Sequence, residues 1–404
     1  MCIRDRTYTT VLNSGTMGIA TEASFDWNKV VDHAKNAVNK NRKGVQYLFK
    51  KNKIRLVNGE AKFSGSKTVK VGETEFDAEN IIIATGSKVK DIPVFAVDGN
   101  KIISSDHALF QDKLPQSIAV IGGGVIGVEM AYIYSTFGVQ VTIIEALETI
   151  IPFEDHEIAK ELTKEFKKKK IKIYTGAGVE KVEKKDSSMI VKLNDGKEIE
   201  VDQVLSSVGR SPDFDGLDID VAGIETDERG FIKTDNLFRT NVEGIYAVGD
   251  VIATPMLAHT AEHEGIVTVE HIAGIKVHEI DYRLNPGCIY CQPSIASIGY
   301  REAEAIEKGV EIKVGKFPFS ANGKAVASNH TTGFVKVIAE AQTGKIIGAH
   351  IIGYGATDLI SEFLPAMKMG ATVYDIIESI HPHPTLCEAT LEAALNSLDR
   401  TIHM

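Results

Sequence analysis

A glycine-rich turn between an apolar strand and a helix limits what this chain can fold into more than any other feature of its sequence. Ser117–Ile121 is an apolar run, and Gly122–Gly127 directly after it reads G-x-G-x-x-G. Such a run is typical of a strand buried on both faces of a parallel sheet. A helix to about Phe137 and a second strand, Val139–Ile144, follow. This order predicts a dinucleotide-binding domain with a parallel sheet.

Each of the three glycines in this motif has a physical reason to lack a side chain. Gly122 permits the tight turn, Gly124 lets the backbone approach a pyrophosphate, and Gly127 lets the helix pack closely on the strand. The helix N-terminus faces the phosphates with partial positive charge. Glu145 follows the next strand, where a carboxylate would bind ribose hydroxyls and repel a 2′-phosphate. The motif therefore favours NAD over NADP; the alternative interpretation is a structural turn with an incidental glutamate.

A second apolar strand leads to another candidate ligand contact. Gly244–Val248 is followed by Gly249 and Asp250, at the carboxyl edge of a sheet, where α/β proteins bind ligands. A carboxylate there would accept hydrogen bonds from sugar or ribityl hydroxyls, although an Asp that only caps a helix fits the pattern nearly as well. Met256–His259 then begins a helix, whose N-terminus would stabilise negative charge on a reduced flavin.

Hydrophobic periodicity predicts the elements of the rest of the chain. Apolar residues recur at helical spacing over Asp26–Lys51, which indicates a long amphipathic helix. Alternating strands followed by two or three helices to Leu398 predict a separate α+β domain from about Asn285. Further strands are expected at Ile54–Val57, Thr68–Val71, Ile81–Ala84, Val191–Leu193, Lys197–Val201, Val204–Val208, Lys313–Phe317, Phe334–Ala339 and Ile346–Ile352, and a helix over Asp155–Lys170.

Composition excludes several classes of protein. With a net charge of −10 the chain lacks the basic surface that holds a nucleic-acid backbone. No stretch approaches the roughly 18 apolar residues that a membrane helix needs, and Met1–Arg6 lacks the apolar core of a secretory signal. The four cysteines are too few and too scattered for a disulfide-stapled extracellular fold. We therefore expect a non-secreted protein of a reducing compartment.

The motifs occur in the order found in the pyridine nucleotide–disulphide oxidoreductase family, which the chain resembles from about Gly18 to Met404. The segments that carry the resemblance are Ala84–Ser87, Gly122–Glu129, Tyr246–Asp250 and Met256–His259. The resemblance implies an α/β fold with two Rossmann-like domains, the FAD-binding one incomplete, and a C-terminal α+β dimerisation domain. The implied domains are a remnant of the FAD domain over 1–115, an NAD domain over 116–240, a returning part of the FAD domain over 241–284 and the dimerisation domain over 285–404.

The resemblance also implies which residues line the two cofactor sites. Gly209 is among these residues. The alternative interpretation, that this glycine serves only a turn after a strand, stays open. The implied FAD contacts are Gly59, Thr85, Gly86, Ser87, Asp250, Met256, Leu257, Ala258 and His259. The implied NAD contacts are Gly122, Gly123, Gly124, Val125, Ile126, Gly127, Val128, Glu129, Glu145, Val179 and Gly209.

A histidine-rich segment near the C-terminus is the candidate acid–base element. His381–Glu388 reads H-P-H-P-T-L-C-E, and Pro384 fits the first turn of a helix. Glu388 would reach back toward His383 and orient its imidazole as a base, although a capping or core histidine fits the residue types equally well. The segment resembles that of the dihydrolipoamide dehydrogenases. The resemblance makes His383 the base and Glu388 its partner, acting in the other subunit's active site of a homodimer.

The other titratable candidates have simpler interpretations. His381 is expected to be structural, and a metal site there is improbable without further ligands. Cys288 and Cys291 have C-x-x-C spacing but lie in an apolar strand with no helix N-terminus to lower a thiol pKa. Cys387 is expected to serve packing. No metal is expected.

The start of the chain leads to a further expectation. In the family a first dinucleotide motif and a C-x-x-x-x-C redox pair precede the segments quoted above, and neither is found ahead of those segments in this sequence. We therefore expect an N-terminally truncated chain that binds FAD poorly and is inactive by itself. Cys2 is not assigned a catalytic role, because its spacing to Gly18 is too short for the family's second redox cysteine.

By the resemblance, the full-length enzyme oxidises dihydrolipoamide to lipoamide, with electrons passing through a disulfide and FAD to NAD⁺. The expected partners are the second subunit and the lipoyl domains of 2-oxoacid dehydrogenase or glycine cleavage complexes. The expected compartment is the cytoplasm, or the mitochondrial matrix in a eukaryote. The alternatives are another FAD-dependent disulfide reductase, similar to glutathione or mercuric reductase, or a noncatalytic nucleotide-binding fragment.

Overall fold

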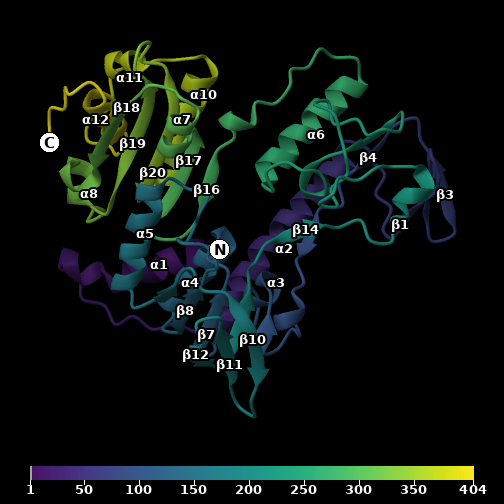
Figure 1. The fold of residues 1–404 in the computed structure, drawn as a ribbon, viewed down its shortest axis with the longest axis horizontal. Helices are drawn as coiled ribbons and strands as arrows, with labels where there is room; N and C mark the ends of the chain where they lie inside the picture. The colour runs from purple at the N-terminus through teal and green to yellow at the C-terminus, as the bar shows by residue number, and fades with distance from the viewer. Residues whose placement is uncertain (1) are drawn as a thin grey trace. The chain divides into compact units, whose positions relative to one another are not determined.

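The computed structural model describes residues 2–404, which divide into two compact units (Figure 1). The first unit contains the residues up to 35, 91–208 and 283–404, and the second contains 36–90 and 209–282. After the N-terminal helix α1, Cys2–Leu12, the long helix α2, Trp27–Lys51, begins in the first unit and ends in the second. The helix predicted over Asp26–Lys51 is thus confirmed.

A parallel five-stranded sheet forms the centre of the 91–208 segment. Its strand order is β6-β13-β7-β8-β9, which makes β9 an edge strand. Ile118, Val120 and Ile143 are fully buried, as expected for strands covered on both faces. The elements are β6 Ile102–Ile103, α3 Ser105–Ala108, β7 Ser117–Ile121, α4 Val125–Thr136, β8 Gln140–Ile144, α5 His156–Lys168, β9 Lys172–Tyr174 and β13 Gln203–Ser206.

A small antiparallel meander is inserted between β9 and β13. It consists of β10 Val179–Lys184, β11 Met189–Leu193 and β12 Glu198–Val201, in that order. The Asn194–Gly196 segment turns the chain between β11 and β12, and Gly196 has φ +84°. The predicted hairpin is confirmed, because a turn with positive φ favours glycine.

The C-terminal part of the first unit is an antiparallel sheet covered by helices. Its strand order is β16-β17-β20-β19-β18. Helix α12 approaches β18 so closely that a Cβ at Gly315 would lie 1.9 Å from the carbonyl oxygen of Ala393. The elements are β16 Gly287–Ile289, β17 Ser294–Gly299, α7 Glu302–Glu307, β18 Ile312–Pro318, α8 Gly323–Ala327, β19 Gly333–Glu340, β20 Ile346–Gly353, α9 Ala356–Leu359, α10 Phe363–Lys368, α11 Val373–Glu378 and α12 Glu388–Asn396.

A buried lysine joins this antiparallel sheet to the parallel one. The Lys336 ammonium on β19 lies 2.9 Å from Asp155, the N-cap residue of α5, 2.9 Å from Glu157 and 2.6 Å from Glu302. The Lys336 side chain is 1% exposed. Since an isolated charge is very costly to bury, these carboxylates are what allow a lysine at this position.

The second unit has its own apolar core, which includes Phe63, Ile83, Ile245 and Val251. One sheet is the antiparallel order β1-β2-β3, and two further strand pairs are β14-β5, antiparallel, and β15-β4, parallel. The elements are β1 Ala61–Gly65, β2 Thr68–Val71, β3 Thr74–Asp77, β4 Ile81–Ile83, β5 Ser87–Val89, β14 Arg210–Pro212, β15 Ile245–Ala247 and α6 Ala258–Ile272.

Two sequence-based expectations about elements are wrong. Ile54–Val57 forms no strand, and its apolar side chains are exposed, because no neighbouring strand pairs with this segment in the described residues. Four short helices, α9 to α12, follow β20 instead of two or three. Pro365 lies at the start of α10 and Gly370, with φ +76°, follows its end, which divides the helical stretch. No helix among residues 2–404 has both the length and the apolarity to cross a bilayer.

Candidate nucleotide and acid–base sites

The glycine motif lies where the backbone leaves β7 and enters α4. Gly122 has φ +102°, and a Cβ there would lie 2.4 Å from the carbonyl oxygen of Ser207. A Cβ at Gly127 would lie 1.9 Å from the carbonyl oxygen of Gly122. Gly124, in contrast, has φ −72° and no heavy atom within 4 Å of its Cβ position. Packing therefore explains Gly122 and Gly127, whereas the open space at Gly124 fits a position that a ligand approaches.

Glu145 lies beside this motif, directly after β8. Its Oε2 accepts a hydrogen bond from the Gly123 amide at 2.7 Å, and its Oε1 accepts one from the Leu147 amide at 2.8 Å. Helix α4 begins at Val125, which is exposed, and has Gly124 as its N-cap without a side-chain capping bond. The first amides of α4 are therefore available to an anion at the carboxyl edge of the sheet.

Other residues of the implied NAD site are placed differently. Val128 is buried, and the Glu129 carboxylate accepts a hydrogen bond from the Tyr290 amide at 2.8 Å. Burial raises the pKa of Glu129. This carboxylate thus fixes the segment after β16. Val179 is the first residue of β10, and Gly209, with φ +109°, lies in the second unit.

In the second unit, two parallel strands bring the implied FAD contacts together. Thr85–Ser87 follows β4 and Asp250 follows β15, so both lie at the same carboxyl edge. The Ser87 hydroxyl donates to Asp250 Oδ2 at 2.5 Å. A Cβ at Gly59 would lie 2.5 Å from Val71 Cγ1, so packing on β2 accounts for this glycine.

Arg210 and Glu264 also belong to this region, although the sequence analysis did not identify them as candidate site residues. Arg210 Nε donates to the Ser87 hydroxyl at 2.7 Å, and its Nη2 donates to the Ser87 carbonyl oxygen at 2.6 Å. Buried Glu264 on α6 accepts from the Gly249 amide at 2.6 Å, which ties α6 to the Asp250 turn. The sequence offers a pattern that marks Arg210, because this cation directly follows Gly209. No sequence pattern marks Glu264.

The Met256–His259 segment leads into α6 as the sequence predicts. Leu257 is the N-cap residue and makes no side-chain capping bond, and α6 has 15 residues. Met256 and Leu257 are half-buried, while Ala258 and His259 are exposed. A helix of this length presents partial positive charge at its N-terminus.

His383 and Glu388 make the contact that the sequence predicts. His383 Nδ1 lies 2.8 Å from Glu388 Oε1, and the Thr385 amide donates to Glu388 Oε2 at 2.9 Å. Although burial opposes ionisation, the Thr385 amide and the His383 ring hold the pKa of Glu388 below its ordinary value. An ionised Glu388 makes Nδ1 the donor and leaves Nε2 of His383, whose side chain is 76% exposed, as the proton acceptor.

Pro384 does not occupy the first turn of a helix, which corrects the sequence-based expectation. Helix α12 begins at Glu388, with Cys387 as its N-cap residue. The Glu388 carboxylate accepts from the Thr385 amide, and the Thr385 hydroxyl donates to the Pro382 carbonyl oxygen at 2.7 Å. These bonds fold 382–387 into a turn before the helix.

His381 is buried and paired, in contrast to His383. Its Nε2 lies 2.7 Å from Glu362 Oε1, and its Nδ1 lies 2.9 Å from the Ser379 carbonyl oxygen. Thr390 on α12 donates to the other oxygen of Glu362 at 2.8 Å. This network fixes the histidine segment to its neighbours, which agrees with a structural role for His381.

The described cysteines lack the surroundings of reactive thiols. Cys288, Cys291 and Cys387 are free, and burial raises the pKa of all three thiols. Since the thiolate is the reactive form, these residues are poor nucleophiles at neutral pH. No group of three His, Cys, Asp or Glu among residues 2–404 is arranged to hold a metal ion.

Comparison with known proteins identifies the family. A model described as pyridine nucleotide–disulphide oxidoreductase matches residues 6–265, and the model of that family's dimerisation domain matches residues 285–394. The chain belongs to the pyridine nucleotide–disulphide oxidoreductase family. The family match confirms an oxidoreductase and gives no support to the expectation that the chain is inactive.

Relatives within this oxidoreductase family share about two-fifths of the sequence. A dihydrolipoyl dehydrogenase from Rhizobium etli is 40% identical over 96% of this chain and 85% of its own length. The mitochondrial dihydrolipoyl dehydrogenase of Pisum sativum is 42% identical over 91% of this chain and 75% of its own.

Solved structures share the fold of this chain. LpdA from Mycobacterium tuberculosis gives a TM-score of 0.90 at 23% identity, covering 97% of this chain and 89% of that one. The HOCl-induced flavoprotein disulfide reductase RclA from Escherichia coli gives 0.85 at 24% identity, covering 98% and 89%. The predicted α/β class with a C-terminal dimerisation domain is confirmed.

Proposed function

We propose that this oxidoreductase acts on dihydrolipoamide, converting it to lipoamide while electrons pass through a disulfide and FAD to NAD⁺. The observation that carries the proposal is the 2.8 Å contact between Glu388 and the exposed His383. Oxidation of a dithiol begins with removal of a thiol proton, because the thiolate is the nucleophile. The relatives named dihydrolipoyl dehydrogenase, 40% identical in two cases, support the same substrate.

The proposed role of His383 follows from its hydrogen bonding. Glu388 fixes the Nδ1–H tautomer and stabilises the imidazolium that forms when Nε2 accepts the proton of a substrate thiol. By the family resemblance the pair acts in the active site of the second subunit. A dimerisation domain matched over residues 285–394 supports a homodimer.

The proposed FAD site combines acceptors and a helix N-terminus. Asp250 offers carboxylate oxygens to ribityl or ribose hydroxyls, and the uncapped start of α6 offers partial positive charge. When bound, FAD would take electrons from the dithiol and pass a hydride to NAD⁺. The residues proposed to contact it are Gly59, Thr85, Gly86, Ser87, Asp250 and Met256–His259.

The proposed NAD site extends from the glycine motif. Gly122–Glu129 would cradle the pyrophosphate, Glu145 would bind the ribose hydroxyls, and Val179 and Gly209 would complete the site. The Glu145 carboxylate already lies 2.7 Å from the Gly123 amide, where a 2′-phosphate would meet like charge. NAD is therefore proposed over NADP.

Lipoyl domains of 2-oxoacid dehydrogenase or glycine cleavage complexes are the proposed carriers of the dithiol. The cytoplasm, or a mitochondrial matrix, is the proposed compartment. A relative that is named mitochondrial, from Pisum sativum, supports the second setting for a eukaryotic source.

The proposal is tested by offering thiol or disulfide substrates and nucleotides to the purified protein. Dihydrolipoamide is combined with NAD⁺ or NADP⁺, glutathione disulfide is combined with NADH or NADPH, and the absorbance of the reduced nucleotide is followed. NADH formation with dihydrolipoamide alone is the expected result. Preferential oxidation of NADPH by glutathione disulfide would indicate another disulfide reductase, and nucleotide binding without turnover would indicate a noncatalytic protein; either outcome overturns the proposal.

Replacing Gly124 by Ala is expected to weaken NAD⁺ binding by about tenfold or more without changing stability. The Ala methyl group meets no protein atom within 4 Å and φ is −72°, but it would occupy the space that a bound pyrophosphate needs. Gly323→Ala is the matched control, because its Cβ position is also open. Calorimetric titration with NAD⁺ checks this; equal affinity of both variants would exclude a pyrophosphate at Gly124.

A further inference from the structure

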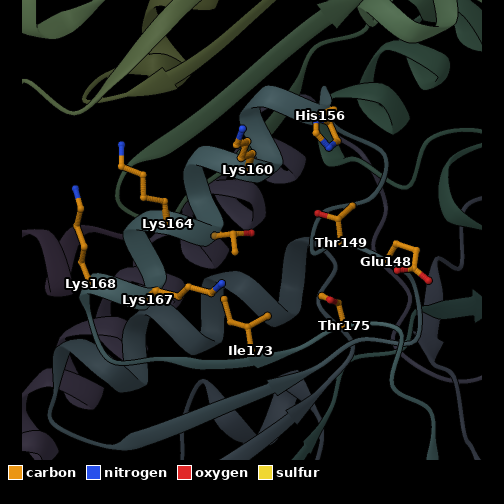
Figure 2. Close-up of a pocket in the computed structure, with 10 residues that line it drawn as sticks. Glu148, Thr149, His156, Lys160, Lys164, Lys167, Lys168, Ile173 and Thr175 are labelled. Carbon is orange, nitrogen blue, oxygen red and sulfur yellow. The ribbon is translucent and has the colours of Figure 1, made fainter.

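An open groove runs beside the edge strand β9 in the first unit. It lies between α5 and the loops that follow β8 and β9, and its volume is about 820 Å³ (Figure 2). This is the size of a small-molecule site. None of the glycine-motif residues and neither Glu145 nor Val179 lines it. The groove is thus separate from the proposed NAD contacts.

Four lysines of α5 line the groove at positions i, i+4, i+7 and i+8, which share one helix face. Two of them are engaged: Lys164 pairs with Glu161 at 2.9 Å, and Lys168 pairs with Glu165 at 2.6 Å. Figure 2 shows both of these lysines pointing away from the loops on the other side of the groove. They therefore contribute little to a site between the walls.

Lys160 and Lys167 differ from the other two lysines. Neither forms an ion pair with any part of the chain that the structure describes. Lys167 extends across the groove toward Ile173 and Thr175 (Figure 2). In a chain with a net charge of −10, two uncompensated ammonium groups on one groove wall attract anions.

The opposite wall limits which anion fits. The Thr175 hydroxyl offers a hydrogen bond to an oxygen atom, and the Thr149 hydroxyl, which donates to the Ile150 carbonyl oxygen at 3.1 Å, offers only a lone pair. The Glu148 carboxylate repels negative charge and accepts hydrogen bonds from hydroxyls. We propose that this groove binds a small molecule with phosphate groups at the lysine wall and hydroxyl groups toward Glu148. An acidic protein segment is disfavoured, because its charges would extend along the Glu148 wall as well.

The loops around the groove are tied to the nucleotide motif. Leu147, whose amide donates to Glu145 Oε1 at 2.8 Å, accepts through its carbonyl oxygen from the Gly176 amide at 2.8 Å. The groove is therefore at the same carboxyl edge as the motif, although it is lined by other residues. The proposal does not depend on the lipoamide reaction.

The test compares two double variants that remove the same charge from the same helix. Inorganic pyrophosphate is titrated calorimetrically into native protein, Lys160→Gln/Lys167→Gln and Lys164→Gln/Lys168→Gln. Each titration is repeated with saturating NAD⁺, so that binding at the glycine motif is separated from binding in the groove. We expect the Lys160/Lys167 variant to lose at least about tenfold in pyrophosphate affinity, and the Lys164/Lys168 variant to change less than about twofold.

Three outcomes overturn the inference. These are no NAD⁺-independent pyrophosphate binding, an equal loss in both double variants, and binding of poly-glutamate where pyrophosphate does not bind. Thermal unfolding of both variants, with unchanged midpoints expected because these side chains are solvent-exposed, shows that any loss is local. NAD⁺ affinity measured on the same samples is expected to stay the same in both variants, which separates this result from the fate of the lipoamide proposal.

Discussion

His383→Gln is expected to lower dihydrolipoamide-dependent NADH formation by about 10²- to 10⁴-fold, the usual contribution of a positioned base. The glutamine keeps a polar side chain of similar size on a largely exposed segment, so the fold is expected to remain. It has no group that accepts the thiol proton. The measurement is kcat in the dithiol assay, with NAD⁺ affinity determined in parallel and expected to be unchanged.

The matched control for this variant is His33→Gln. His33 lies on α2, is also exposed and is not among the residues of the proposed sites. Glu388→Gln is expected to give a smaller loss, because His383 keeps its imidazole and loses only the carboxylate that orients it. Full activity of His383→Gln would remove the proposed base from the reaction.

Lys336→Met is expected to lower the free energy of unfolding by about 3–5 kcal/mol, the typical cost of breaking a buried ion pair by removing one partner. The ammonium is 1% exposed and lies within 2.9 Å of Asp155. Methionine fills similar space but leaves the carboxylates of Asp155, Glu157 and Glu302 without the cation that they share. Urea denaturation followed by circular dichroism measures the effect.

Lys316→Met is the matched control, because Lys316 also pairs with Glu157, at 2.5 Å, but is 44% exposed. Its loss is expected to cost less than about 1 kcal/mol, as for other surface ion pairs. An equal loss of unfolding free energy in the two variants would show that burial does not increase the contribution of Lys336 to stability.

The pH dependence of stability is a second test of the ion pairs around Lys336. Burial opposes ionisation of Glu157, but Lys316 and Lys336 hold its pKa below the ordinary value of 4.5. A carboxyl group whose pKa is lower in the folded state contributes stability above its unfolded pKa and loses it as the pH falls through the folded value. Stability of the native protein is therefore expected to fall with pH below about 4.5. Lys336→Met should show a shallower fall, which denaturation at several pH values checks.

The elements that could be predicted from the sequence are those with strong local patterns. Ser117–Ile121 is β7 as predicted, and α2 lies within one residue of its expected start, because buried parallel strands and long amphipathic helices leave clear periodicities. Ile54–Val57 has a strand-like composition but forms no strand. Strand formation depends on a distant partner, which composition does not encode.

The same distinction applies to the candidate sites. The His383–Glu388 contact could be expected because both residues lie on one short segment. Arg210 contacts Ser87, 123 positions away in the sequence, and Lys336 contacts Asp155 across 181 positions. Such contacts arise from the packing of whole sheets, so no local pattern predicts the contact itself, although the cation directly after Gly209 marks Arg210 as a candidate.

The most direct test of the proposed reaction is a crystal structure of the flavin-loaded protein. We expect a dimer in which His383 of one subunit faces the flavin held by Asp250 and α6 of the other, within reach of a bound dithiol. A structure that places His383 far from every flavin ring, within each subunit and across the dimer, would contradict the proposed reaction.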